Sequence, residues 1–344
     1  MKNDSSSLAG LLSVPGALVK LGCALMGSGR GAQAVALLDR WLAQRPDDPQ
    51  LRAAARVILS HGVPGWHSPM LADRTRNEAY AAAIGRVVTP QATVLDIGSG
   101  SGLLAMMAAR AGARRVVACE AHPALAETAR QIIQVNGWGD SVEVVGRPST
   151  DLRRDVDLDG GADVIIAEIF SNDLLIEGAL PTFRHAAAEL AVPGARFIPR
   201  AMSIRVALCH REFEEPFDVV AGFDLSLFRR HVPAYRKIPV GDKKLSLRSE
   251  AADLFRFEPG APNLPLNGAT KLALTAKGGP ANGVCQWIRL QLDPDIAYEN
   301  APEPERRSHW AAHFYPLPEG RTVQEGETIQ VNAAHDETRL QLWF

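Results

Sequence analysis

The sequence predicts an α/β protein in which a Rossmann-like sheet domain is followed by a mainly antiparallel β-barrel, with a short helical segment in front. Three patterns support this fold class. Between residues 66 and 168, apolar runs rich in β-branched residues alternate with helical stretches, which is typical of a parallel sheet. Past residue 200, short β-rich runs are separated by Gly and Pro turns, which indicates an antiparallel sandwich or barrel. Before residue 66, Leu, Ala and Arg dominate, which favours helices.

The 344-residue chain is long enough for two or three domains, each with its own core. We expect a helical segment at 1–65, a sheet domain at 66–200 and a β-barrel at 201–344, with an irregular, charged arm near 222–258. A formal charge of −2 provides no basic field for nucleic acid. The four cysteines lack the spacing of a zinc site or a disulfide framework, so we expect no metal.

The helical segment is interrupted at "GSGRG" and "RPDDP". Some of its positions match the spacing of one tetratricopeptide repeat, a helix–turn–helix unit. They are Leu21, Gly22, Leu25, Ala34, Leu38 and Pro46. A plain helical hairpin packed through Leu and Ala explains the same pattern. Because such repeats normally need stacked neighbours, we expect the segment to pack on the next domain.

The apolar stretch "LAGLLSVPGALV" near the start is shorter than the roughly 18 residues needed to span a membrane. Pro15 and Gly16 interrupt it, and the preceding Lys2 and Asp4 do not form the positive start of a signal peptide. We therefore expect a cytoplasmic protein without a membrane partner.

Strands of both main domains can be placed by their apolar runs. In the sheet domain they are "ATVLDIG" (92–98), "RRVVACE" (114–120), "SVEVVG" (141–146) and "ADVIIAE" (162–168). Helical stretches such as "SGLLAMMAARAGA" separate them, as in βαβ units. In the barrel they are "AMSIRVALC" (201–209), "TKLALTAKG" (270–278), "VCQWIRLQL" (284–292), "ETIQVNA" (327–333) and "RLQLWF" (339–344).

A glycine-rich loop, "VLDIGSGSGLL" (94–104), joins the first strand to the following helix. Glycines there let backbone N–H groups approach a ligand at a helix start. An acidic residue ends the second strand, where it can accept hydrogen bonds from two ribose hydroxyls, and a serine follows the third strand, near an adenine edge. The candidate cofactor-binding residues are Asp96, Gly98, Gly100, Glu120 and Ser149.

This set resembles a class I S-adenosylmethionine-dependent methyltransferase. The alternative is a nicotinamide-dependent dehydrogenase, whose fingerprint is G-x-G-x-x-G rather than the alternating G-x-G-x-G found here.

Two glutamates, Glu168 and Glu177, lie in "AEIFSNDLLIEGALP" (167–181), where the fourth strand ends. Two carboxylates can pair with the fork of N–H donors on a guanidinium. They would orient one nitrogen for in-line methyl transfer and stabilise its charge. The alternative is a pair of solvated loop glutamates.

Over about residues 66–344 the chain resembles the protein arginine methyltransferase family. The segment 167–181 is similar to the family's double-glutamate loop. "SHWAAHFYPL" (308–317) is similar to its Thr-His-Trp loop, with Ser308 in place of threonine. "HSPMLADRTRNEAY" (67–80) is similar to its cofactor-covering helix.

The resemblance implies roles for individual residues. His67, Met70 and Arg76 would contact the cofactor, and Arg76 would bind the cofactor's carboxylate. Glu168 would stand beside the sulfonium of the cofactor. Met70, Trp310 and Glu177 would contact the substrate. The residues implied as catalytic are Glu168, Glu177, His309 and Asp73, with Asp73 paired to His309.

The resemblance also implies S-adenosylmethionine as cofactor, an arginine-containing peptide or protein as substrate, and a homodimer formed through the arm. Ala179 stands where members that dimethylate one nitrogen usually carry a second methionine, so we expect monomethyl- or symmetric dimethylarginine. One departure is the stretch "RVILSHGVPGW" (56–66), which lacks the tyrosines that many members carry before the covering helix.

Other functions remain open at this point. One is methyl transfer to a small guanidino or amine metabolite, or to a ribosomal-protein lysine or N-terminus. Another is a catalytically idle, S-adenosylmethionine-binding scaffold.

Overall fold

The computed structural model describes residues 10–11, 13–14, 16–213, 218–261, 263–318 and 321–344. The chain divides into two compact units that interleave along the sequence. The first comprises Met1–Ala72, Tyr80–Glu168 and Ala188–Arg196, and the second comprises Asp73–Ala79, Ile169–Ala187 and Phe197–Phe344. The contiguous domain limits expected from the sequence stay a prediction. The apolar stretch at 8–19 lies partly outside the described residues.

The first unit opens with helices α2 (Ala17–Gly27), α3 (Gly31–Gln44) and α4 (Pro49–Leu59). α4 begins where Asp48 accepts hydrogen bonds from the amides of Gln50 and Leu51, a standard N-cap. The three helices share a core with α8 (Pro123–Val135) of the sheet domain. A hydrogen bond of 2.7 Å joins Gln131 to Asp39 across the same contact. The expected helices are present and pack on the sheet domain, but their assignment as a tetratricopeptide repeat is not confirmed.

The core of the first unit is a sheet with strand order β3-β2-β1-β4-β5. The pairs β1–β2, β2–β3 and β1–β4 are parallel. All residues of β1 are buried, because helices cover both faces of such a sheet and its strands become continuously apolar. The strands are β1 (Thr93–Ile97), β2 (Arg115–Cys119), β3 (Val142–Val145), β4 (Ala162–Ala167) and β5 (Ala191–Ile198).

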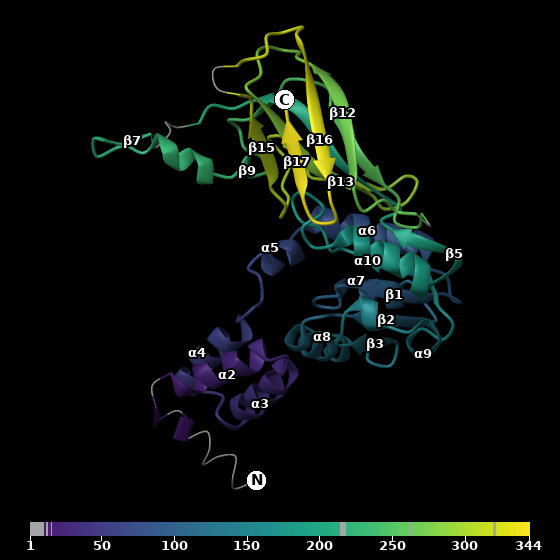
Figure 1. Ribbon diagram of the computed structural model, residues 1–344. Coiled ribbons are helices and arrows are strands. Elements are labelled where there is room, and N and C mark those ends of the chain that lie inside the picture. The colour runs from purple at the N-terminus through teal and green to yellow at the C-terminus, as the bar shows by residue number, and fades with distance from the viewer. Residues whose placement is uncertain (1–9, 12, 15, 214–217, 262, 319–320) are drawn as a thin grey trace. The chain divides into compact units, whose positions relative to one another are not determined.

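Register brings the carboxyl ends of the central strands to one edge of the sheet. Asp96 of β1 pairs with Ala118 of β2 and with Ile166 of β4. Loops that follow these strands therefore meet, as is usual for ligand sites in parallel sheets. The helices of this unit further include α7 (Leu103–Arg110), α9 (Arg154–Asp157) and most of α6 (Arg74–Val87) (Figure 1).

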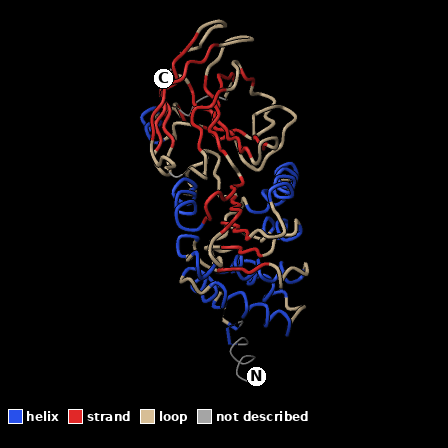
Figure 2. Tube along the Cα trace, turned by 90° about the vertical axis from the view of Figure 1, so that its right-hand side faces the viewer, coloured by secondary structure: helices blue, strands red, loops and turns tan. Residues whose placement is uncertain are grey.

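The second unit consists mainly of antiparallel strands, drawn as red segments in the upper part of Figure 2. One sheet has the order β10-β6-β13-β15-β9, with β11 on β6 and β14 on β13, and another has the order β12-β16-β17. This confirms the predicted fold class. The strands are β6 (Ala201–His210), β9 (Arg236–Ile238), β10 (Ser246–Leu247), β11 (Ala252–Phe257), β12 (Gly268–Thr275), β13 (Gly283–Gln291), β14 (Ala297–Glu299), β15 (Ala312–Pro316), β16 (Thr328–His335) and β17 (Leu340–Trp343).

An arm extends from the strands of the second unit (Figure 1). It contains the hairpin β7 (Val219–Val220) and β8 (Phe223–Asp224), followed by a 3₁₀-helix at Ser226–His231. Large apolar side chains on it face solvent, with Phe223 71% and Leu227 74% exposed. The sequence indicated charge at this segment, whereas the exposed surface is in large part apolar.

None of the helices among the described residues combines the length and the apolar character that a membrane span requires.

Candidate active site

The glycine loop of the first unit follows β1 directly. Gly98, Gly100 and Gly102 have φ angles of 69°, 53° and 77°, in the left-handed region that glycine adopts without strain. The amides of Gly98 and Ser99 both donate to the Cys119 carbonyl, each at 3.0 Å. These bonds fold the loop onto the end of β2, and α7 begins directly behind it. Because its glycines carry no side chain, such a loop lets a ligand approach the backbone closely.

Glu120 follows β2 and is 8% exposed. Its carboxylate accepts a hydrogen bond from the Gly100 amide at 2.9 Å through Oε2 and from the His122 amide at 2.7 Å through Oε1. Each oxygen keeps a further lone pair for another donor. The backbone therefore fixes this carboxylate where two ribose hydroxyls would be recognised.

Two serines near the loop are also buried. Ser149 begins a short 3₁₀-helix after β3. The Ser99 hydroxyl has no hydrogen-bond partner among the described residues, and a buried hydroxyl is unfavourable unless a ligand or a water satisfies it. The glycine cradle, the fixed Glu120 carboxylate and this orphaned hydroxyl fit an adenosyl cofactor.

The stretch 67–80, expected as one covering helix, is divided into a short helix, α5 (His67–Leu71), and the start of α6; α5 belongs to the first unit. A Cβ atom at Gly100 would lie 3.9 Å from Cε1 of His67, so this imidazole is close to the glycine loop. Its ring stacks on Trp66 with centroids 4.0 Å apart. Burial lowers the pKa of His67, against the opposing charge of Glu120. Met70, later in the helix, is buried.

Asp73 and His309 meet in the second unit, as the resemblance implied. Nδ1 of His309 lies 2.9 Å from Oδ2 of Asp73, and the His309 amide donates to the same oxygen at 3.2 Å. The Tyr298 hydroxyl lies 2.6 Å from this oxygen and 2.7 Å from the Ser308 hydroxyl. Ser308 in turn accepts from the Trp310 amide at 3.1 Å. The cluster fixes the histidine of the Ser-His-Trp loop.

These contacts set the protonation states of Asp73 and His309. Burial opposes ionisation of Asp73, but hydrogen bonds from His309, Tyr298 and two backbone amides outweigh it and lower its pKa to about 2. Burial lowers the pKa of His309, although Asp73 acts in the opposite direction. Burial and the hydrogen bond to Asp73 raise the pKa of Tyr298. At neutral pH the cluster holds an ionised aspartate and a neutral histidine.

Tyr298 is the residue of this cluster that the sequence analysis missed. It lies on β14 and is 3% exposed. A single tyrosine in a short strand belongs to no recognisable motif, so only its burial beside Asp73 reveals it.

The segment that leads to Glu177 is tied to the Ser-His-Trp loop within the second unit. Nε1 of Trp310 donates to the Phe170 carbonyl at 2.8 Å, and the Ala311 amide donates to Oδ1 of Asn172 at 2.8 Å. Asn172 also accepts through its carbonyl from the Gln286 side chain on β13, at 3.1 Å. A side chain of β13 and two residues of the Ser-His-Trp loop thus determine the path of this segment.

Within the same segment, Asp173 accepts hydrogen bonds from the Ser171 hydroxyl and the Leu175 amide. These bonds shape the turn before Glu177, and α10 (Ala179–His185) starts just after it. Burial, followed by the charge of Asp173, raises the pKa of Glu177. The Glu177 residue is nevertheless exposed, so water offsets much of this effect.

The remaining expected site residues are distributed over both units. Arg76 is 2% exposed in the second unit, where its amide donates to Oδ1 of Asp73 at 3.0 Å. Glu168 directly follows β4 and belongs to the first unit, and Glu177 belongs to the second. The joint action of Glu168 and Glu177 therefore stays a prediction.

The chain is similar in sequence to proteins of known families. A model of the family "Ribosomal protein L11 methyltransferase (PrmA)" matches residues 80–198. An "Arginine N(omega)-methyltransferase" of Streptomyces achromogenes subsp. streptozoticus is 38% identical over 311 residues, which cover 88% of this chain and 84% of that protein. "Protein arginine N-methyltransferase 7" of Gallus gallus is 29% identical and shares 81% of this chain. This chain covers only 45% of the length of that relative.

Solved structures share the fold at lower identity. The Trypanosoma brucei PRMT1 enzyme–prozyme heterotetrameric complex with AdoHcy has a TM-score of 0.71 at 24% identity, over 80% of this chain and 88% of that chain. Protein arginine methyltransferase 10 of Arabidopsis thaliana has a TM-score of 0.64 at 19% identity, over 77% of this chain and 86% of that chain. These structures show the shared fold, and the relative of 38% identity shows that the chain belongs to the arginine methyltransferase family of class I methyltransferases.

Proposed function

We propose that this protein transfers methyl groups from S-adenosylmethionine to a guanidinium nitrogen of an arginine in a peptide or protein. The observation that carries the proposal is the fixed loop before Glu177, which is hydrogen-bonded to the Ser-His-Trp loop through Trp310 and Asn172. A carboxylate on such a loop can hold a guanidinium without reorganising, which is the main requirement for positioning a nucleophile.

The first unit supplies residues for the cofactor, which contributes a methyl group on a positively charged sulfur when it is bound. Glu120 would accept hydrogen bonds from the ribose hydroxyls, and the backbone at Gly98 and Gly100, which carries no side chain, would lie close to the ligand. His67 and Met70 of this unit would cover it, with Ser149 toward its base. Arg76, which belongs to the second unit, would lie toward the carboxylate of the cofactor. The orphaned Ser99 hydroxyl supports a ligand at this loop.

The acceptor guanidinium would be held by Glu168 and Glu177. Their charges would orient one nitrogen and stabilise the positive charge that the product retains. His309 would be a positioning residue, braced by Asp73, and Trp310 would form the wall of the acceptor site. A neutral His309 adds no positive charge of its own to compete with a cationic acceptor.

The names of the relatives suggest a second candidate acceptor. The relative of 38% identity is named for arginine itself, whereas the animal relatives are named for protein arginine. This observation favours free arginine, a small guanidino metabolite, as the alternative acceptor.

One experiment separates the two acceptors. Purified protein is incubated with isotope-labelled S-adenosylmethionine and either free L-arginine or peptides that contain one arginine, and products are analysed by mass spectrometry. The proposal expects label on the peptide arginine. Label on free arginine alone would assign the second function, and label on neither acceptor would contradict arginine methylation.

We further propose that the protein is a homodimer joined through the arm. The exposed apolar side chains of the arm support this, because large apolar side chains gathered on one exposed segment are typical of an interaction site.

A further inference from the structure

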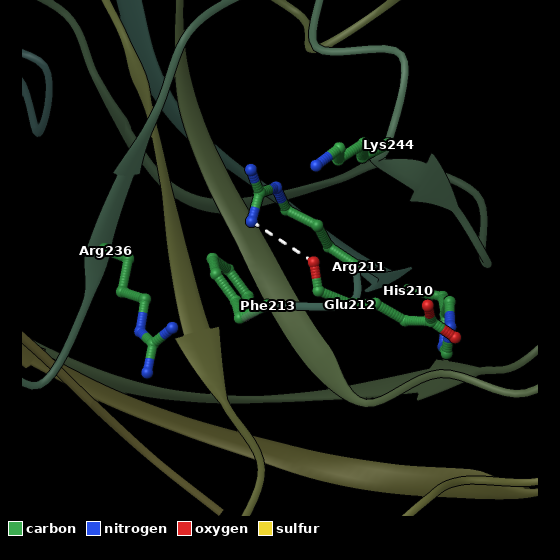
Figure 3. A pocket seen from close by; sticks show the side chains of 6 residues that line it. All are labelled: His210, Arg211, Glu212, Phe213, Arg236 and Lys244. Atoms are coloured by element: carbon green, nitrogen blue, oxygen red, sulfur yellow. Dashed lines mark hydrogen bonds between the residues drawn. The ribbon is translucent and has the colours of Figure 1, made fainter. Parts of the chain in front are cut away.

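A cavity of about 700 Å³ opens in the second unit beside the base of the arm. Three short segments form it: the end of β6 with the residues after it, the first residue of β9, and the loop before β10. The volume lies in the range of roughly 300–1,000 Å³ that is typical of small-molecule sites. Its lining residues are His210, Arg211, Glu212, Phe213, Arg236 and Lys244 (Figure 3).

Two guanidinium groups share one aromatic ring in this cavity. The Cζ atom of Arg211 lies 4.2 Å from the centroid of the Phe213 ring, and that of Arg236 lies 4.3 Å from it. Figure 3 shows them on opposite sides of the ring. Cation–π contacts favour each guanidinium separately. The two positive charges nevertheless lie close enough to repel each other, which favours an anion between or beside them.

The chain compensates only part of this charge. Nε of Arg211 donates to Oδ2 of Asp242 at 2.8 Å, so this guanidinium has its own carboxylate. Arg236 has no carboxylate within ion-pair distance among the described residues. Lys244 forms no ion pair there either, but its charge acts on Asp242, and its amide donates to Oδ1 of Asp242 at 2.9 Å. The side chain of Glu212 points away from Arg236 in Figure 3. Counted over the described residues, three cationic side chains (Arg211, Arg236 and Lys244) stand against two carboxylates (Glu212 and Asp242), so this part of the cavity carries a net positive charge.

An unsatisfied polar atom gives a second indication of a ligand. Nδ1 of His210 is buried and has no hydrogen-bond partner within the described part of the chain. Such an atom is unfavourable unless water or a ligand reaches it.

This cavity cannot serve the acceptor of the methyl transfer. A guanidinium substrate is a cation, and Arg211, Arg236 and Lys244 would repel it. The lining contains none of the residues assigned above to the cofactor or to the acceptor.

We propose that the cavity binds a small organic anion with at least two negative charges, either a phosphate ester or a dicarboxylate. The planar fork of Arg236 suits two oxygens of one anionic group, and Lys244 supplies a point charge for a second. Arg211, held by Asp242, keeps the aromatic ring in place between the two guanidinium groups.

Calorimetry on the full chain tests this site, with pyrophosphate and glutarate as probes at constant ionic strength. We expect saturable binding of at least one probe, and the tighter probe identifies the class. The double variant Arg236→Gln/Lys244→Gln should bind about 10-fold more weakly or worse, because charge-assisted hydrogen bonds are lost. Lys243→Gln is the matched control, since Lys243 is exposed and outside the lining, and it should bind as the wild type does.

Methyl transfer by the double variant should be retained, which separates this site from the proposed function. If that variant does not fold, as judged by its thermal melt, Lys244→Gln alone provides the same comparison. No saturable binding to the wild type, or equal binding to the double variant, would overturn the proposal.

Glu214 and Glu215 follow Phe213 in the sequence and lie outside the described residues. Probe binding to Glu214→Gln/Glu215→Gln but not to the wild type would mean that the chain neutralises its own cavity, and would equally overturn it.

Discussion

Nδ1 of His309 lies 2.9 Å from Oδ2 of Asp73, and the two side chains are 3% and 4% exposed. This contact connects the start of the covering helix to the Ser-His-Trp loop within one compact unit. Because the pKa values of both groups are lowered, the folded protein favours the deprotonated form of each. The pair therefore links the stability of this unit to pH.

Acidification should destabilise the protein through this pair. The unfolded chain takes up protons at His309 below pH about 6.5 and at Asp73 below pH about 4, while the folded chain resists both. The contribution of this pair to the free energy of unfolding is thus fully present above these pH values and is lost as the pH falls through and below them. Asp73 accounts for about 2 kcal/mol between pH 5 and 2, from its folded pKa of about 2. Urea unfolding of wild type and Asp73→Asn at pH 7, 5, 3.5 and 2.5 measures the difference, and parallel pH profiles would contradict it.

Replacing Glu120 should weaken cofactor binding. Glu120→Ala removes the carboxylate proposed to accept two ribose hydroxyls, at a cost of about 2–4 kcal/mol in binding free energy. Calorimetry with S-adenosylhomocysteine measures the loss. Asp140→Ala is the control, because Asp140 is an exposed carboxylate of the same unit. Unchanged affinity in Glu120→Ala would remove this residue from the cofactor site.

Product type depends on the space beside the attacking nitrogen. Ala179 is fully buried at the start of α10, and its small side chain stands where a methionine is expected in members that dimethylate one nitrogen. We expect monomethyl- or symmetric dimethylarginine in fragmentation spectra of the product. A predominance of asymmetric dimethylarginine would show that the pocket argument is wrong while the enzyme class is right.

The arm should control assembly. Phe223→Glu/Leu227→Glu places charges on side chains that are 71% and 74% exposed in the isolated chain. If these residues are buried between two copies, the variant becomes monomeric in light scattering while the wild type is a dimer. Val57→Glu is the control, because Val57 is 51% exposed on a helix of the N-terminal segment. A wild type that is already monomeric would refute the arm as a dimer contact.

Strands of the parallel sheet were predictable because burial on both faces makes them continuous apolar runs. β5 was missed because Pro193 and Gly194 interrupt its pattern. β10 and β14 have only two and three residues, too few for a visible alternation. The apolar surface of the arm was not predicted, because its apolar residues follow neither a helical nor a strand period and their exposure depends on tertiary structure.

The candidate site also contains residues that the local sequence predicts and residues that it does not. The glycine loop and Glu120 are close in sequence and follow neighbouring strands, so local chemistry predicts them. Asp73 and His309 are 236 positions apart, and no spacing argument connects them. Their pairing was expected only from the family resemblance of two separate motifs. Tyr298, which completes the cluster, has no motif and required the structure.

The central claim is that Glu177 holds the acceptor guanidinium, and one comparison of variants tests it most directly. Glu177→Gln keeps the shape of the side chain and removes its charge, whereas Glu189→Gln does the same at an exposed glutamate downstream of α10. We expect Glu177→Gln to lower kcat for the arginine acceptor by about 100-fold or more, with unchanged affinity for S-adenosylhomocysteine, and Glu189→Gln to match the wild type. A Glu177→Gln variant with wild-type kcat and KM would contradict the account.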